Sequence, residues 1–205
     1  MASPVDICNL ALSHLGNKAQ VSAIAPSDKS TEANLCVIFY PQARDLILEE
    51  YDWNFAIRTV ALADLGSPLS GWAYRYDYPA LCLRPISIKT VNDDTAQDYV
   101  VQGDDTQGRV VLTNTADAEM VFIQRITDTG LFTPTLVEAI SWLLASYLAG
   151  PLTKSSELSQ NALSVYALRV RQAQVMDAKA HKLGGPRQRS GTYTPRGIAA
   201  RNEGA

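Results

Sequence analysis

Residues 71–79 read GWAYRYDYP, and this stretch marks a change in the pattern of the whole sequence. Its four aromatic residues stand at alternate positions: Trp72, Tyr74, Tyr76 and Tyr78. Successive side chains of a β-strand point to opposite faces, so these rings would share one face of a strand. Apolar residues recur at helical spacing before this stretch and at a spacing of two after it. The sequence therefore predicts an α+β fold in which helices come first.

The aromatic row has three interpretations. A row of rings opposite a polar row is typical of a half-buried strand, and this structural interpretation is favoured. Exposed rings could instead stack on the bases of a single-stranded nucleic acid, with Arg75 and Arg84 contacting phosphates. Trp and Tyr are also enriched in contacts between subunits.

The N-terminal region predicts two helices. Ser3, Pro4 and Asp6 match a capping box with proline at the first helical position, and Gly16 suits the C-terminal stop. The predicted buried stripe of this helix is Ile7, Leu10, Ala11 and Leu15. A longer helix is expected from about Asp28, with a kink or two abutting helices at Pro41. Its predicted buried side is Leu35, Phe39, Leu46 and Ile47, followed by the core residues Trp53 and Phe55.

The middle of the chain predicts one small antiparallel sheet. The turn signals NDD, QGDDTQG and NTADA separate the candidate strands. The predicted strands are Trp72–Tyr78, Ile86–Val91, Tyr99–Gln102, Arg109–Thr113 and Met120–Ile126.

Helical spacing returns at Thr133-Pro134. The run LVEAISWLLASYLA is apolar almost all round, which predicts a central, buried helix that ends at Gly150-Pro151. A last helix is expected from about Ser155 to Lys182. Its predicted inward stripe is Leu158, Ala162, Val165, Ala173, Met176 and Ala180.

The C-terminal segment, residues 183–205, differs sharply in composition because it is rich in glycine and arginine and poor in bulky apolar residues. Such a segment buries too little apolar surface to fold alone. Its candidate binding residues are Arg187, Arg189, Tyr193, Arg196 and Arg201. Arginine-rich arms dock on acidic protein surfaces or phosphates, so we interpret it as an assembly arm, with a solubilising tail as the alternative.

Composition excludes several classes of protein. The chain has 205 residues, a formal net charge of −3 and 46% apolar residues, which suits one sizeable domain and does not favour a generic nucleic-acid binder. The N-terminus lacks the pattern of a signal peptide, and the apolar run 136–152 is shorter than the ~20 residues of a membrane span. We expect a protein made inside the cell, with no membrane partner.

No catalytic or metal-binding motif is present. The three cysteines, Cys8, Cys36 and Cys82, are far apart in the sequence, which favours buried thiols over a zinc site. The GDDTQG turn lacks the ligand spacing of a calcium loop. The best candidates for the two carboxylates of a glycosidase are Glu49, Glu50 and Asp52. Adjacent glutamates of a helix point in different directions, however, so they are poorly placed to act as a pair. We therefore expect no cofactor, no metal and no enzymatic activity.

Several stretches together resemble one family. They are NLALSHLG, YPQARDLILEEYDWNFAIRTVALA, the aromatic row leading into CLR, and LLASYLAGPLTKSSELSQNALSVYALRVRQAQVMDA. In this order they resemble the tail tubular protein A family, the head-to-tail adaptors of short-tailed phages and related prophages. The resemblance covers residues 5–180.

The resemblance implies a structural adaptor in the neck of a virion. Such proteins form a ring of twelve copies between the portal protein and the tail nozzle, and genome DNA passes through the channel. It implies a mainly α fold, with a helical bundle, an inserted antiparallel β-sheet and an extended arm. The expected parts are N-terminal helices (1–66), β region (67–130), C-terminal helices (131–182) and portal-binding arm (183–205). The alternatives are a virion-associated peptidoglycan hydrolase and a single-strand nucleic-acid binding module.

Overall fold

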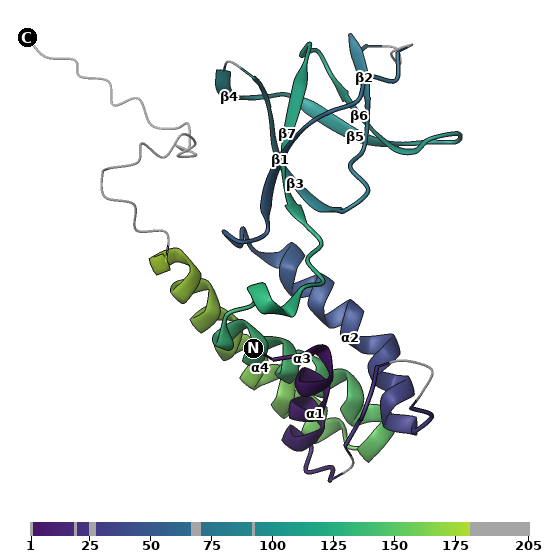
Figure 1. The fold of residues 1–205 in the computed structure, drawn as a ribbon, viewed down its shortest axis with the longest axis vertical. Helices are drawn as coiled ribbons and strands as arrows, with labels where there is room; N and C mark the ends of the chain where they lie inside the picture. The colour runs from purple at the N-terminus through teal and green to yellow at the C-terminus, as the bar shows by residue number, and fades with distance from the viewer. Residues whose placement is uncertain (1, 19, 25–27, 67–70, 92, 181–205) are drawn as a thin grey trace, which may run out of the picture.

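The chain folds into a helical lobe and a β lobe that follow one another along the long axis of the molecule (Figure 1). The computed structural model describes residues 2–18, 20–24, 28–66, 71–91 and 93–180. Among these residues the helices are α1 (Pro4–His14), α2 (Thr31–Glu50), α3 (Pro134–Thr153) and α4 (Ser156–Ala180), with a short 3-10 helix at Thr129–Leu131. The strands lie between α2 and α3 in the sequence, so the β lobe is an insertion between helices.

The β lobe holds two antiparallel sheets, where the sequence predicted one. The strands are β1 (Ile57–Ala61), β2 (Tyr74–Asp77), β3 (Cys82–Thr90), β4 (Asp93–Gln97), β5 (Tyr99–Asp104), β6 (Gly108–Thr113) and β7 (Ala118–Gln124). The first sheet has the order β1-β7-β3-β4 and the second β2-β6-β5. The expected mixture of helices and antiparallel strands is therefore confirmed, and the single sheet is wrong.

Two of these strands have no counterpart in the predicted set. Strand β1 falls within residues 1–66, which were assigned to helices, and β4 occupies part of the expected NDD turn. Four of the five residues of β1 and of β4 are exposed, so neither strand shows the alternation of apolar and polar residues that marks a half-buried strand. Each forms because a neighbour pairs with it, β7 for β1 and β3 for β4.

The starts of α1 and α3 depend on residues within one turn, and both agree with the prediction from the sequence. Ser3 and Asp6 form the predicted capping box of α1, and Gly16 has the positive φ of +71° expected after a helix. Thr133 caps α3 with Pro134 in its first turn, as predicted.

Neither of two prolines ends its helix, so the expected pair of abutting helices at Pro41 and the expected helix end at Gly150-Pro151 are both wrong. Helix α2 begins later than expected, after the N-cap Ser30, and it continues through Pro41 as one helix. Helix α3 continues through Gly150 and Pro151 and ends at Thr153, and its C-cap Lys154 has a left-handed φ of +53°. Each proline removes one backbone hydrogen bond, and packing of the remaining helix against its neighbours outweighs that loss.

Helix α3 is the centre of the helical lobe, because α1, α2 and α4 all pack against it. The core around it also takes Trp53 and residues such as Ile123 from the β7 end. By length and composition α3 is the one helix among the described residues that could cross a membrane. Its apolar window is 56% buried within the protein, as in an ordinary core helix.

A second core lies between the two sheets. It contains Tyr76 from the second sheet and Ile88, Met120 and Phe122 from the first, so the sheets pack face to face. Trp53 is buried and Phe55 is half-buried in the first core, as expected.

The buried stripes of the helices differ in part from the prediction. In α1, Cys8 and Leu12 are buried and Leu10 and Leu15 are only half-buried. In α2, Leu46 is exposed and Leu35 and Phe39 are half-buried.

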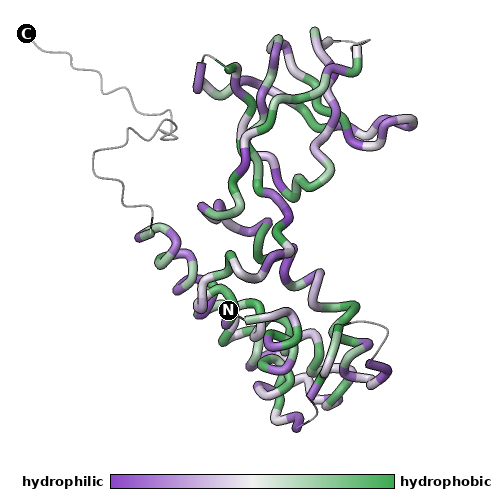
Figure 2. The backbone as a smooth tube through the Cα atoms, viewed as in Figure 1, coloured by the Kyte–Doolittle hydropathy of each residue, from purple (hydrophilic) through white to green (hydrophobic). Residues whose placement is uncertain are grey.

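Helix α4 differs most. Leu158, Met176 and Ala180 are exposed, and the buried residues are Ala162, Tyr166, Val170, Ala173 and Asp177. Apolar residues occur on more than one side of α4, so periodicity alone does not select the face that α3 covers. Figure 2 shows hydrophobic and hydrophilic residues mixed along these helices.

Candidate functional site

The aromatic row does not form an exposed platform. Tyr74 and Tyr76 lie in β2 with ring centroids 6.0 Å apart. Tyr76 and Tyr78 are 3% and 8% exposed and belong to the core between the sheets, while Trp72 is half-buried outside that core. The Tyr76 hydroxyl donates a hydrogen bond to the Thr115 carbonyl at 3.0 Å. Base stacking needs accessible ring faces, so this geometry fits a core strand better than a nucleic-acid site.

Tyr78 also has a partner above its ring. The guanidinium of Arg109 lies 4.2 Å from the ring centroid, a cation–π contact. Burial raises the pKa of the Tyr78 hydroxyl, with a smaller contribution from the nearby Cys82 thiol. Tyr78 therefore stays neutral and serves as a packing residue.

The two arginines considered as phosphate ligands are engaged inside the protein. Arg84 donates to Asp52 and, at 2.8 Å, to the backbone carbonyl of Glu49. The Arg75 guanidinium lies 3.0 Å from the Asp104 carboxylate. Both cations are paired with carboxylates, so among the described residues Arg109, over the Tyr78 ring, is the cation of this region that makes no ion pair.

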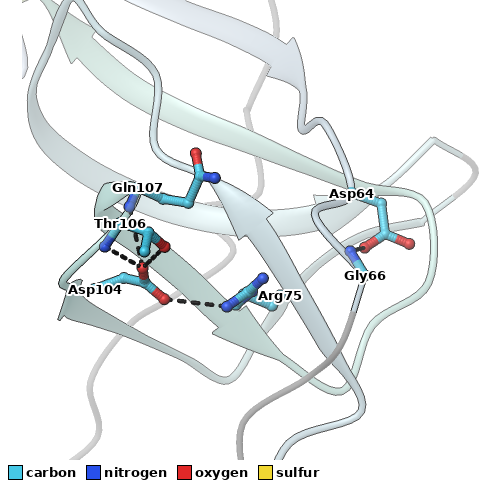
Figure 3. Close-up of polar contacts among 6 residues, drawn as sticks. All are labelled: Asp64, Gly66, Arg75, Asp104, Thr106 and Gln107. Carbon is cyan, nitrogen blue, oxygen red and sulfur yellow. Dashed lines mark hydrogen bonds and ion pairs between the residues drawn. The ribbon is translucent and has the colours of Figure 1, made fainter.

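Asp104 organises the GDDTQG turn in which calcium was considered (Figure 3). One carboxylate oxygen accepts from the backbone nitrogens of Thr106 and Gln107 and from the Thr106 hydroxyl, at 2.7 to 3.0 Å. The other oxygen faces Arg75 across the sheet. The Thr106 hydroxyl bond and the backbone bonds lower the pKa of Asp104 to about 2. Its oxygens thus close a turn, and no group of three or more metal-ligating side chains occurs among the described residues.

The carboxylates proposed for glycosidase chemistry point to different partners. Glu50 accepts a hydrogen bond from the Tyr166 hydroxyl, Asp52 pairs with Arg84, and the Glu49 side chain is exposed. Burial, followed by the Glu50 bond, raises the pKa of Tyr166. A retaining or inverting glycosidase needs two carboxylates across one cleft, and this arrangement does not present such a pair.

The structure brings together a serine and a histidine that sequence spacing could not connect. The Nε2 atom of His14 lies 3.1 Å from the hydroxyl oxygen of Ser141, and the His14 ring stacks on Trp142 with centroids 3.7 Å apart. Ser141 donates its proton to the Glu138 carbonyl at 2.8 Å and is fully buried. A nucleophilic serine must give its proton to the histidine and reach a substrate. This pair therefore holds α1 on α3.

The three cysteines are buried and free. Cys8 of α1 and Cys36 of α2 contact one another, and the pKa of Cys8 is raised by its bond to Cys36 and by burial. Burial raises the pKa of Cys82 as well, whereas the bond to Cys8 lowers the pKa of Cys36. All three thiols are enclosed by the protein, which fits a packing role.

A hollow of about 650 Å³ opens beside the ends of β1, β3 and β7. It is lined by Ala61, Leu62, Thr90, Val91, Ala116, Asp117 and Ala118. Asp117 is its single charged side chain, so a polar ligand would find few groups to hold it.

The helical lobe has another kind of candidate surface. Most of the exposed large apolar side chains of the described residues lie on α2 and α4. They are Val37, Ile38, Leu46, Leu158, Leu163, Leu168, Val175 and Met176. Exposed apolar side chains gathered on two helices are typical of protein–protein contacts.

The predicted arm residues Arg187, Arg189, Tyr193, Arg196 and Arg201 lie outside the described residues. Comparison of the sequence with models of known protein families gives no match, and comparison with curated proteins gives none.

Proposed function

We propose that this protein is a structural head-to-tail adaptor in the neck of a short-tailed phage or prophage. The proposal rests on one contrast: most of the candidate polar site residues have partners inside the chain, but the apolar side chains on the outer faces of α2 and α4 do not. Apart from the exposed Glu49, the candidate catalytic and nucleic-acid groups are bonded within the chain, whereas α2 and α4 leave large apolar side chains exposed. Such a chain is suited to assembly, and the family resemblance of residues 5–180 indicates which assembly.

In this proposal the helices act as a mainly helical bundle that builds a ring of twelve copies. The β lobe extends from the bundle, and the ring surrounds the channel for genome DNA without reading its sequence. Residues 183–205 would act as the extended arm on the portal protein, through Arg187, Arg189, Tyr193, Arg196 and Arg201. Twelve arms on one portal would bind more strongly than the same arms separately, because each docked copy raises the effective concentration of the rest. A tail nozzle protein would dock on the opposite side.

The test uses the full chain and a variant that ends at Leu183. Each is mixed with the portal protein of the same genome and examined by native mass spectrometry and electron microscopy. We expect a twelvefold ring on the portal for the full chain, and weaker attachment with an unchanged circular dichroism spectrum for the shortened chain. A full chain that ignores the portal contradicts the adaptor function. Normal binding by the shortened chain contradicts the role of the arm.

A further inference from the structure

The outer side of α2 is a largely exposed stripe with apolar and acidic residues. Ile38, Gln42, Asp45 and Glu49 follow at spacings of four and three residues, so they share one side of the helix. Ile38 is 53% exposed, and Leu46 beside the stripe is 45% exposed. The opposite side of α2 is buried in the helical lobe. The stripe is therefore available to a partner.

The outer side of α4 is an unpartnered stripe with apolar and basic residues. Leu168, Arg171, Val175 and Ala178 follow at spacings of three and four residues. Leu168 is 62% exposed and Val175 is 51% exposed. The opposite side of α4 packs on α3.

The two stripes carry opposite charges that the fold leaves unpaired. Within the described residues, neither the Glu49 carboxylate nor the Arg171 guanidinium makes an ion pair. Arg169 and Lys179 are also exposed on α4 and add positive charge. Asp45 on α2 already faces Arg44 and Arg125. Glu49 and Arg171 are therefore the charges free to pair with another molecule.

The stripes lie on different sides of the helical lobe, since α2 and α4 each pack on α3 and present their outer sides to solvent (Figure 1). A twofold contact would place each stripe against a copy of itself, so an acidic stripe would face an acidic stripe and a basic stripe a basic one, and like charges would repel. A head-to-tail contact would place apolar residues together and pair Glu49 with Arg171. Repeated head-to-tail contacts close into rings when the rotation permits.

We propose that the α2 stripe of one copy docks on the α4 stripe of a second copy of this chain. The inference rests on the proposed ring and names the two surfaces through which neighbouring copies meet. Ile38 and Leu46 supply the apolar part on one side, and Leu168 and Val175 supply it on the other.

Charge reversal tests this contact. Glu49→Arg makes both stripes positive, and Arg171→Glu makes both negative, so each variant alone should lose about tenfold or more in self-association. In an equal mixture the two variants can alternate around the assembly. One junction then pairs the new arginine at position 49 with the new glutamate at position 171, and the next junction pairs the native Glu49 with the native Arg171. We expect the mixture to recover the association of the unaltered chain. Asp105→Arg and Lys18→Glu, which change exposed charges away from both stripes, are the matched controls.

Self-association of the free chain is measured by analytical ultracentrifugation. If the free chain is monomeric, the number of copies bound to each portal is measured instead. Ile38→Cys combined with Val175→Cys should give a ladder of linked copies with a flexible bismaleimide, and each single cysteine should not. Loss in the single variants with recovery in the mixture supports the contact. Variants that assemble like the unaltered chain, or a double-cysteine chain without a ladder, overturn it. If the mixture of the two variants recovers self-association but does not bind the portal protein, the contact is supported and the adaptor function is overturned.

Discussion

The carboxylate of Asp177 accepts two hydrogen bonds from Asn54, 3.1 Å from its backbone nitrogen and 2.6 Å from its side-chain nitrogen. The Asn54 amide also donates to the Asp177 backbone carbonyl at 3.0 Å. Asp177 lies on α4 and is 6% exposed, and Asn54 lies in the segment between α2 and β1. This joint ties the far end of the last helix to the point where the chain enters the β lobe.

Replacing Asp177 should destabilise the fold. In Asp177→Ala the half-buried Asn54 loses the carboxylate that accepts from its backbone nitrogen and its side-chain nitrogen, at a cost of roughly 1–3 kcal/mol in the free energy of unfolding. Asp177→Asn keeps a carbonyl oxygen at the same place and should lose much less. Urea denaturation of both variants measures the difference. Equal losses would show that the charge of Asp177, and not its acceptor geometry, is what matters.

The aromatic row should divide into core and surface members. Tyr76→Ala removes a buried ring from the core between the sheets and should cost roughly 3–5 kcal/mol of unfolding free energy. Trp72→Ala should cost about 1 kcal/mol or less, because Trp72 lies outside that core. Thermal unfolding of both variants provides the measurement. A Trp72 variant as unstable as the Tyr76 variant would contradict this division.

The stability of the protein should fall between pH 7 and pH 5 because of His14. Burial, opposed in part by Glu138, lowers the pKa of His14 below its ordinary value of 6.5. The unfolded chain therefore binds a proton more readily than the folded chain, so stability is full above pH 6.5 and declines as the pH drops. His14→Gln removes the titration and leaves an amide that can still donate to Ser141. The melting temperature of the variant should depend less on pH over this range, and parallel curves would refute the assignment.

Asp104 should control stability at lower pH. Its carboxyl pKa is held at about 2, against an ordinary value of 3.8, so its contribution is present above pH 3.8 and is lost as the pH falls toward 2. Asp104→Ala should lower the melting temperature at neutral pH, because the turn and Arg75 both lose their acceptor. Asp104→Asn should lower it less, since the amide oxygen can still close the turn. A larger loss in the asparagine variant would contradict the proposed role of the turn.

The three thiols should be protected in the folded protein. Cys8, Cys36 and Cys82 are buried, so a colourimetric disulfide reagent should label none of them quickly without denaturant. All three should react in concentrated guanidinium chloride. Rapid labelling of the native chain would show that α1 or the inter-sheet core opens more easily than the packing indicates.

Local signals account for the parts of the structure that were predicted well. The Ser3–Asp6 capping box and the Thr133-Pro134 helix start involve residues within one turn, so their chemistry can be read from adjacent letters. The alternation around Tyr76 likewise marks a strand with one buried side. The candidate surface on α4 was harder to predict, since Leu158 and Met176 resemble core residues by type and spacing, yet both are exposed.

The sequence by itself determined where most helices and strands begin, and that this chain mixes both, because those choices depend on neighbouring residues. Tertiary structure alone decided that β1 and β4 are strands, that there are two sheets, and which side of α4 is buried. It also decided that His14 meets Ser141 and that Arg75 meets Asp104. Strand pairing, burial and ion pairing arise between segments far apart in the chain, and their energies depend on distances that only the folded arrangement sets.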